Sequence, residues 1–255
     1  MFLSLFCTFL LIFLIFLKNE HLYLYIYYIR GGHKKLADLL LSQKIVTFVA
    51  NIKVMNWRKI SILFVLLLVA DQVLKIWVKT NFHLGEAVTI FPDWFQLLFV
   101  ENNGAAFGMQ IANNGGFDWG KLFLSIFRIG LVGAMFYYIN YLLKQKAPKG
   151  VIIGLVLIAA GAIGNIIDSA FYGLIFSAST PATVAHLGGS YAPFMMGRVV
   201  DMFYFPLFQW NSCPEWLSFL VDSRNYFFGA IFNLADAYIS VAVVYLLIFH
   251  YKFFK

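Results

Sequence analysis

The stretch FFGAIFNLADAYISVAVVYLLIF, residues 227–249, is the strongest single indication of how this chain folds. It is predominantly apolar and exceeds the roughly 20 residues that an α-helix needs to cross a bilayer. It nevertheless carries a carboxylate, Asp236, and an ionisable group at the centre of such a helix costs about 2.5–3.5 kcal/mol on insertion scales. Asn233 lies three residues earlier on the same helical face, and the same Asn-x-x-Asp spacing recurs at Asn165 and Asp168. Such polar pairs in apolar surroundings indicate a function.

The composition of the whole chain is that of a membrane protein. Of its 255 residues, 62% are hydrophobic and only 12% are charged, whereas a soluble domain is about 45–50% apolar and about 25% charged. The net charge of +7 does not indicate a nucleic-acid partner, because the cations flank apolar segments and form no basic face. Two cysteines and five scattered histidines match neither a disulfide framework nor zinc spacing. We therefore expect no metal site.

The apolar segments predict four membrane helices, at 59–79, 119–143, 150–172 and 226–251. Three lysines lie between the second and third helices, and the positive-inside rule places that connection in the cytoplasm. The loops 80–118 and 173–225 then lie outside. Short alternating runs at 87–91 and 94–100 predict two strands in the first outer loop. We expect an all-α membrane protein: a four-transmembrane-helix bundle with a small extracytoplasmic β-sheet and a long extracytoplasmic loop.

The domain organisation divides the chain at residue 54. Residues 55–255 form the predicted integral membrane domain. Residues 1–54 are an N-terminal extension with two open interpretations: an extra helix, or the product of a mis-set start codon.

Several polar residues also have purely structural interpretations. Asparagine often hydrogen-bonds between membrane helices without any catalytic role. Asp71 and Lys75 are spaced i,i+4 in the favourable order, which is typical of a simple salt bridge. Arg128 is a candidate counter-charge for one of the aspartates.

The predicted topology brings three carboxylates to one side of the membrane. Asp168 ends the third helix, Asp201 lies in the second outer loop, and Asp236 lies near the outer end of the fourth helix. Two carboxylates held close together share one proton, because both cannot ionise easily. The ionised member can then activate water while the protonated member polarises a carbonyl. This chemistry favours hydrolysis of a peptide bond by a carboxylate dyad.

Five short motifs resemble those of lipoprotein signal peptidases, also called signal peptidases II, which are membrane aspartic proteases of bacteria. The resemblance covers residues 55–255 and rests on Ala70-Asp-Gln-Val-Leu-Lys75, Asn102-Asn-Gly-Ala-Ala-Phe107, Gly161-Ala-Ile-Gly-Asn-Ile-Ile-Asp168, Val199-Val-Asp201 and Phe232-Asn-Leu-Ala-Asp236. It implies a catalytic dyad of Asp201 and Asp236. The residues that it implies in supporting or substrate-binding roles are Asn165, Asn233, Asp168, Asn102, Asp71 and Lys75.

The resemblance also implies a substrate and a location. The substrate would be a prolipoprotein with a diacylglyceryl-modified cysteine, cut on the amino side of that cysteine. No cofactor would be needed, and globomycin-type cyclic peptides would inhibit the reaction. The protein would be a monomer among the lipids of the bacterial inner membrane, with its active site on the periplasmic side.

Two features depart from the family pattern. Ser169 stands where the family usually has arginine, so Arg128 or Arg198 is expected to supply the missing charge. The segment 174–197, which we call the insertion, lengthens the usual connection between Asp168 and Asp201 and resembles a long form of Bacteroidetes-type members.

Two other function classes compete with the peptidase. A proton-coupled transporter would also need intramembrane carboxylates, although four helices without an inverted repeat fit it poorly. A non-enzymatic assembly factor would explain the asparagines but not Asp201.

Overall fold

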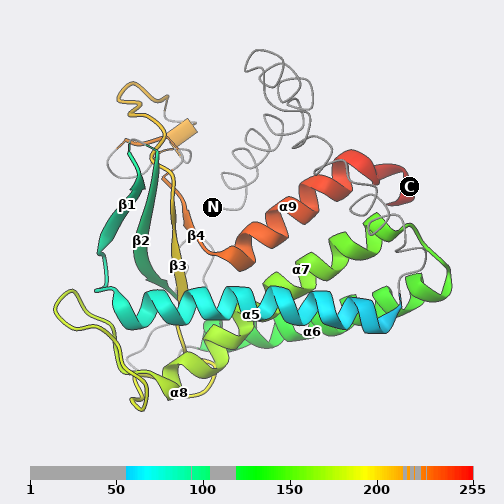
Figure 1. The fold of residues 1–255 in the computed structure, drawn as a ribbon, viewed down its shortest axis with the longest axis horizontal. Helices are drawn as coiled ribbons and strands as arrows, with labels where there is room; N and C mark the ends of the chain where they lie inside the picture. The colour runs from blue at the N-terminus through cyan, green and yellow to red at the C-terminus, as the bar shows by residue number, and fades with distance from the viewer. Residues whose placement is uncertain are drawn as a thin grey trace, which may run out of the picture.

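The computed structural model describes residues 56–92, 94–103, 119–214, 217–218, 221, 225–227 and 229–254. The predicted extension 1–54 therefore lies outside the described residues. Four long α-helices contain about half of the described residues, and a sheet stands at one end of them (Figure 1). The long helices are α5 (Trp57–Asn81), α6 (Trp119–Lys144), α7 (Lys149–Ile167) and α9 (Leu234–Phe249).

Within the part of the chain that the structure describes, three helical stretches are long and apolar enough to cross a membrane. They are α5, α6 and the stretch 149–175, in which α7 continues through a π-helix, η2 (Asp168–Tyr172), into α8 (Gly173–Ile175). Large apolar side chains stay exposed on α5 and α6, including Leu66 at 62% and Phe123 at 67%. Exposure of this kind suits a lipid environment, so the structure is consistent with the predicted helical membrane protein.

The predicted start of the fourth helix is wrong. The helix was expected from residue 226, but α9 begins at Leu234. The preceding residues Ile231–Phe232 instead form strand β4, and Asn233 then caps the helix. Asp236 therefore lies in the first turn of α9 and not in the interior of a longer apolar helix. An apolar run of this length fits either a strand or a helix, and the polar cap decides where the helix starts.

The sheet has four antiparallel strands in the order β1-β2-β3-β4. The two expected strands are present as β1 (Ala87–Phe91) and β2 (Phe95–Asn102). The sequence did not predict β3 (Val199–Tyr204), which carries Asp201. Asp201 was expected on a loop, and its position on a buried strand pairs it with Val100 of β2. The sheet thereby fixes Asp201 relative to the helices.

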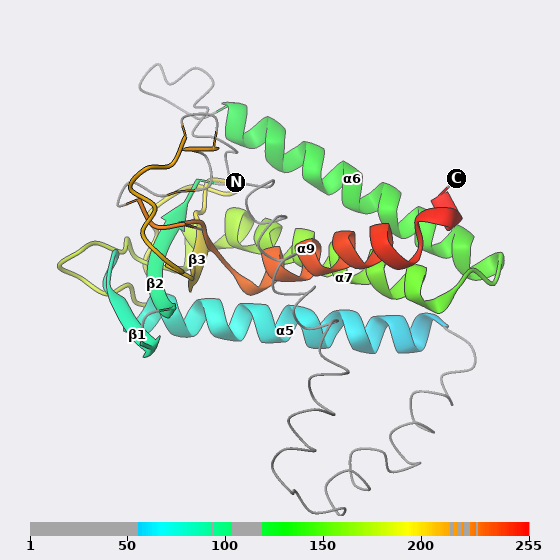
Figure 2. The same cartoon turned by 90° about the horizontal axis from the view of Figure 1, so that it is seen from above.

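The central helix of the bundle is α7, which contacts α5, α6 and α9. Half of the apolar window in 149–175 is buried, against 17% in α5 and in α6. In the view from above, α9 runs between α5 and α6 along α7 (Figure 2). Glycines permit this close contact: a Cβ atom on Gly161 would overlap the Ala235 carbonyl oxygen and the Ile239 side chain of α9. Small residues commonly let membrane helices approach in this way.

Gly161→Val is therefore expected to destabilise the bundle by about 1–3 kcal/mol, because overpacking a tight contact forces side chains and backbone to shift. The measurement is the thermal unfolding midpoint in detergent micelles. Gly130→Val is the matched control, since nothing lies within 4 Å of the corresponding Cβ position on α6. Equal midpoints for the two variants would contradict a tight α7–α9 contact.

The insertion, 174–197, folds back on the helix from which it departs. Phe176 and Leu187 form an isolated antiparallel bridge. Backbone amides of Tyr191 and Gly197 donate to the carbonyls of Gly173 and Ser169, each at 2.8 Å. The insertion is thus an ordered part of the structure beside the sheet.

Candidate active site

The N-terminus of α9 carries the first half of the candidate site. Asn233 and Asp236 form a capping box: the Asn233 side chain accepts from the Asp236 amide at 3.0 Å, and the Asp236 carboxylate accepts from the Asn233 amide at 3.5 Å. Such reciprocal bonds satisfy donors that the first helical turn leaves unpaired. The Asp236 side chain is therefore held at the helix end, next to the sheet.

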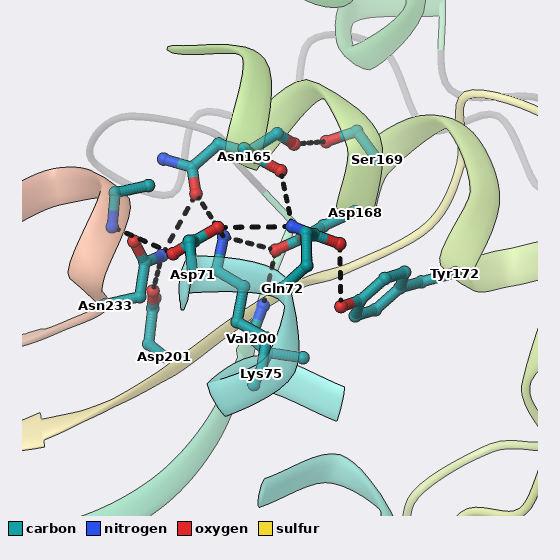
Figure 3. Close-up of polar contacts among 12 residues, drawn as sticks. Asp71, Gln72, Lys75, Asn165, Asp168, Ser169, Tyr172, Val200, Asp201 and Asn233 are labelled. Carbon is teal, nitrogen blue, oxygen red and sulfur yellow. Dashed lines mark hydrogen bonds and ion pairs between the residues drawn. The ribbon is translucent and has the colours of Figure 1, made fainter. Parts of the chain in front are cut away.

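Side-chain amides connect the two carboxylates expected to form the dyad. Asn233 donates to Asp201 at 2.7 Å and to the side-chain oxygen of Asn165 at 3.1 Å. Asn165 in turn donates to Asp236 at 2.8 Å. The helix α7, the strand β3 and the start of α9 meet at this point (Figure 3). The two asparagines hold Asp201 and Asp236 in one hydrogen-bonded group.

Asp201 is almost completely buried, with 3% of its surface exposed. Its second carboxylate oxygen accepts a long bond, 3.4 Å, from the amide of Asn102 on β2. Burial first, and the charge of Asp236 second, raise the pKa of Asp201 well above its usual range. Hydrogen bonds from Asn233 and Asn102, and the charge of Lys75, act in the opposite direction. The Asp201 carboxyl therefore keeps its proton at pH values where an exposed aspartate has lost it.

A buried ionic cluster lies directly behind the two asparagines. Lys75 contacts Asp71 at 3.0 Å and Asp168 at 2.8 Å, and it donates to the side-chain oxygen of Asn165 at 2.8 Å. The side chains of Lys75, Asp71 and Asp168 are at most 1% exposed. The predicted i,i+4 salt bridge is thus present, but it is part of a larger buried cluster (Figure 3). The cluster fixes the orientation of Asn165.

Asp71 links this cluster to α9, because its carboxylate accepts from the Ala235 amide at 2.9 Å. Asp168 is held similarly: it accepts from Gln72 at 3.0 Å and, at 3.4 Å, from the Val200 amide next to Asp201. These two carboxylates therefore position the elements that carry the dyad.

The sequence did not single out Gln72 or Tyr172. Tyr172 donates to the Gln72 side-chain oxygen at 3.1 Å, and Gln72 then donates to Asp168. The available signal was weak: Gln72 lies within a motif that resembles the family, and Tyr172 follows Asp168 by four residues. Both contribute neutral donors that orient a buried carboxylate.

The two arginines expected to replace the family arginine have different surroundings. Arg198 pairs with Glu101 at 3.2 Å. Arg128 on α6 is half-buried and interacts electrostatically with Asp236. Ser169 donates to the Asn165 carbonyl at 3.0 Å, and Lys75 neutralises the neighbouring Asp168. The positive charge beside Asp168 thus comes from α5.

The geometry places a proton donor and a proton acceptor together at the junction of sheet and helices. Among the described residues, no group of three or more His, Cys, Asp or Glu side chains could hold a metal ion. A paired buried carboxyl and carboxylate can activate a water molecule and polarise a carbonyl group. The arrangement therefore suits hydrolysis of a peptide bond.

The chain is similar to several known proteins. A family model described as "Signal peptidase (SPase) II" matches residues 63–252, which include every predicted site residue. Lipoprotein signal peptidases of two Porphyromonas gingivalis strains are 46% identical over 195 residues, covering 75% of this chain and 82% of each relative. A lipoprotein signal peptidase of Amoebophilus asiaticus is 35% identical over 183 residues, covering 70% and 71%. A solved bacterial membrane enzyme has a similar fold, with a TM-score of 0.52 at 20% identity, over 78% of this chain and 91% of that one.

Proposed function

Because the chain belongs to the signal peptidase II family and cleaves the signal peptides of prolipoproteins, we propose that it does so with a dyad of aspartates, Asp201 and Asp236. The family resemblance inferred from the sequence is confirmed, and a transporter function is not supported. The single observation that carries the proposal is the hydrogen-bonded group in which Asn233 and Asn165 join the two carboxylates. Membership makes the chain a peptidase, and the aspartic mechanism is our inference.

The proposed reaction needs only the proton shared by the dyad. The ionised carboxylate takes a proton from water, which attacks the scissile carbonyl carbon, while the protonated carboxyl donates a proton to the carbonyl oxygen. When the tetrahedral intermediate collapses and its C–N bond breaks, the carboxyl that took the water proton gives it to the leaving amine. The other carboxylate takes the proton of the hydroxyl group that becomes the new carbonyl, which restores the dyad. Asn233 and Asn165 keep the two carboxyl groups in position during these transfers.

The site lies at the end of the bundle that faces the sheet, which suits a substrate held in the outer leaflet. The turn between α6 and α7, with Lys144, Lys146 and Lys149, lies at the opposite end of the helices (Figure 1). We infer from the positive-inside rule that this turn is cytoplasmic and that the dyad faces the periplasm at the inner membrane. A fourth span would consist of α9, whose 16 residues reach about 24 Å.

Exposed aromatic side chains at the edge of the sheet support placing the sheet at the membrane interface. Phe91 and Trp94 are half exposed and their rings stack at 5.2 Å. Aromatic side chains concentrate at the level of the lipid head groups. A sheet resting there would meet a diacylglyceryl-modified cysteine arriving by lateral diffusion, and the enzyme would act as a monomer among lipids.

The test is cleavage of a purified prolipoprotein by the purified protein in lipid. We expect cleavage on the amino side of a diacylglyceryl-modified cysteine, inhibition by globomycin, and no cleavage of the same precursor without the lipid. Mass spectrometry of the product identifies the bond. Equal cleavage of the unlipidated precursor would contradict the proposed substrate class. Inhibition by a metal chelator or a serine-directed reagent would contradict the aspartic mechanism.

The pH dependence provides an independent test of the dyad. Burial and the charge of Asp236 raise the pKa of Asp201. We therefore expect the alkaline limb of the cleavage rate to lie where the pH rises through the upper apparent pKa of the pair. Asn102→Leu removes a hydrogen bond to the Asp201 carboxylate, so it should raise that pKa and move the alkaline limb upward by about one pH unit. The rate is measured against pH, with His83→Gln as the control, because His83 is an exposed histidine that pairs with Glu86. An unmoved limb in Asn102→Leu would contradict the assignment.

A further inference from the structure

A second buried ionic cluster lies outside the candidate active site. Its centre is Glu101, near the end of β2, whose side chain is 2% exposed. Glu101 pairs with Lys79, which is completely buried at the end of α5. It also accepts from Ser179 of the insertion at 2.8 Å and from Arg198 at 3.2 Å. Three separate parts of the chain therefore converge on one carboxylate.

The insertion contributes more than Ser179 to this cluster. Lys79 donates to the Ser179 hydroxyl at 3.0 Å and lies over the Tyr191 ring at 5.0 Å. The Tyr191 hydroxyl accepts from the Arg198 backbone amide at 2.7 Å. Burial raises the pKa of Tyr191 to about 12, so this hydroxyl stays protonated near neutral pH. The contacts fasten the insertion to α5 and to the start of β3.

Glu101 is also connected to the catalytic strand through the sheet. It pairs with Val200 across β2 and β3, and its neighbours Val100 and Asn102 pair with Asp201 and Val199. Side chains alternate between the faces of a strand, so the Glu101 side chain lies on the face of the sheet opposite to that of Asp201. Its ion pairs anchor β2 on that face. Its position sets where the Asn102 amide lies.

The contact that depends on this position is the bond from Asn102 to Asp201. Its length of 3.4 Å is at the upper limit for a hydrogen bond. A shift of β2 by a few tenths of an ångström would therefore break it, whereas the short bond from Asn233 to Asp201 at 2.7 Å would survive. The Asn102 contact is the part of the site most sensitive to how β2 is held.

We propose that the insertion, through Ser179 and Glu101, is a positioning element that keeps Asn102 hydrogen-bonded to the catalytic carboxyl of Asp201. The proposal rests on the proposed function, because it takes Asp201 as a member of the dyad. Glu101 and Ser179 touch neither substrate nor reacting atoms in this role. They act on catalysis only through β2.

The charges around Asp201 define how the role can be detected. Asp236 of α9 and Lys75 of α5 face Asp201, together with the amides of Asn233 and Asn102. Glu101 lies on the opposite face of β2, where Lys79 and Arg198 pair with it. Loss of the Asn102 bond should change the proton affinity of Asp201, whereas simple loosening of the insertion should not. The pH profile therefore separates positioning from stability.

The experiment compares Ser179→Ala and Glu101→Gln with wild type in the lipidated-precursor assay. Ser190→Ala is the matched control, since Ser190 is an exposed serine of the same insertion. We expect kcat to fall about tenfold in Glu101→Gln and by less in Ser179→Ala, with KM unchanged. The alkaline limb should move to higher pH in both, as in Asn102→Leu. Ser190→Ala should match wild type.

Two results overturn the proposal and identify where it fails. If Glu101→Gln or Ser179→Ala unfolds at a lower temperature but keeps the wild-type kcat and pH profile, the insertion only stabilises the fold. Asp201→Asn is assayed in parallel: if that variant still cleaves at the wild-type rate, the dyad itself is misassigned. Should Glu101→Gln fail to fold, the milder Ser179→Ala decides the question.

Discussion

Replacing Asp201 by asparagine is expected to lower prolipoprotein cleavage by about 10²–10⁴-fold, the usual contribution of a general acid or base. Asparagine has nearly the same shape, and it can keep a hydrogen bond with Asn233 in place of the 2.7 Å contact. It cannot hold or release the shared proton at any accessible pH. The variant should therefore fold and enter the membrane but lose catalysis.

The measurement is single-turnover cleavage of a diacylglyceryl-modified precursor by protein in lipid. Glu86→Gln is the matched control, because it removes an exposed carboxylate that pairs with His83. Binding of globomycin and the unfolding midpoint show whether the Asp201→Asn site is still formed. Cleavage at a near wild-type rate would remove Asp201 from the dyad.

The same substitution at Asp236 should have an equally large effect, and the two effects should not add. Residues that act as one unit lose most of their contribution when either is removed. The double variant Asp201→Asn, Asp236→Asn is therefore expected to be about as inactive as each single variant. Additive losses would indicate that the two carboxylates act in separate steps.

Hydropathy was sufficient to predict the long helices. The predicted limits 59–79 and 119–143 differ from α5 (Trp57–Asn81) and α6 (Trp119–Lys144) by at most two residues. Residues 226–227 and 229–232 were misassigned because apolar side chains alone do not distinguish a buried strand from a helix. The strand β3 was missed because its burial depends on pairing with β2, which is distant in sequence.

The motifs located the candidate site, but they could not predict its connections. The structure brings Asn102, Asn165 and Asn233 together around the two aspartates of the proposed dyad. The hydrogen bond that the Ala235 amide donates to Asp71 joins residues 164 positions apart. No periodicity relates such residues, so only the packing of α5 against α9 shows that Asp71 caps a helix. The cluster around Glu101 escaped prediction because it depends on the insertion.

Lys75→Met is expected to destabilise the protein by about 3–5 kcal/mol, the usual effect of removing one partner from a buried ion pair. Methionine fills a similar volume but leaves Asp71 and Asp168 buried without their cation. It also removes a donor from the Asn165 side chain, which supports the proposed dyad. We therefore expect both a lower unfolding temperature and weaker cleavage.

The unfolding midpoint in detergent micelles should fall by about 6–20 °C for a chain of this size. Lys144→Met is the matched control, because Lys144 is exposed at the end of α6. Adding Asp168→Asn to Lys75→Met removes one of the two unpaired charges, so the double variant should recover part of the lost stability. A midpoint equal to that of Lys144→Met would mean that the buried cluster contributes no net stability. A double variant less stable than Lys75→Met alone would mean that Asp168 stabilises the fold through Gln72 and Val200 more than through Lys75.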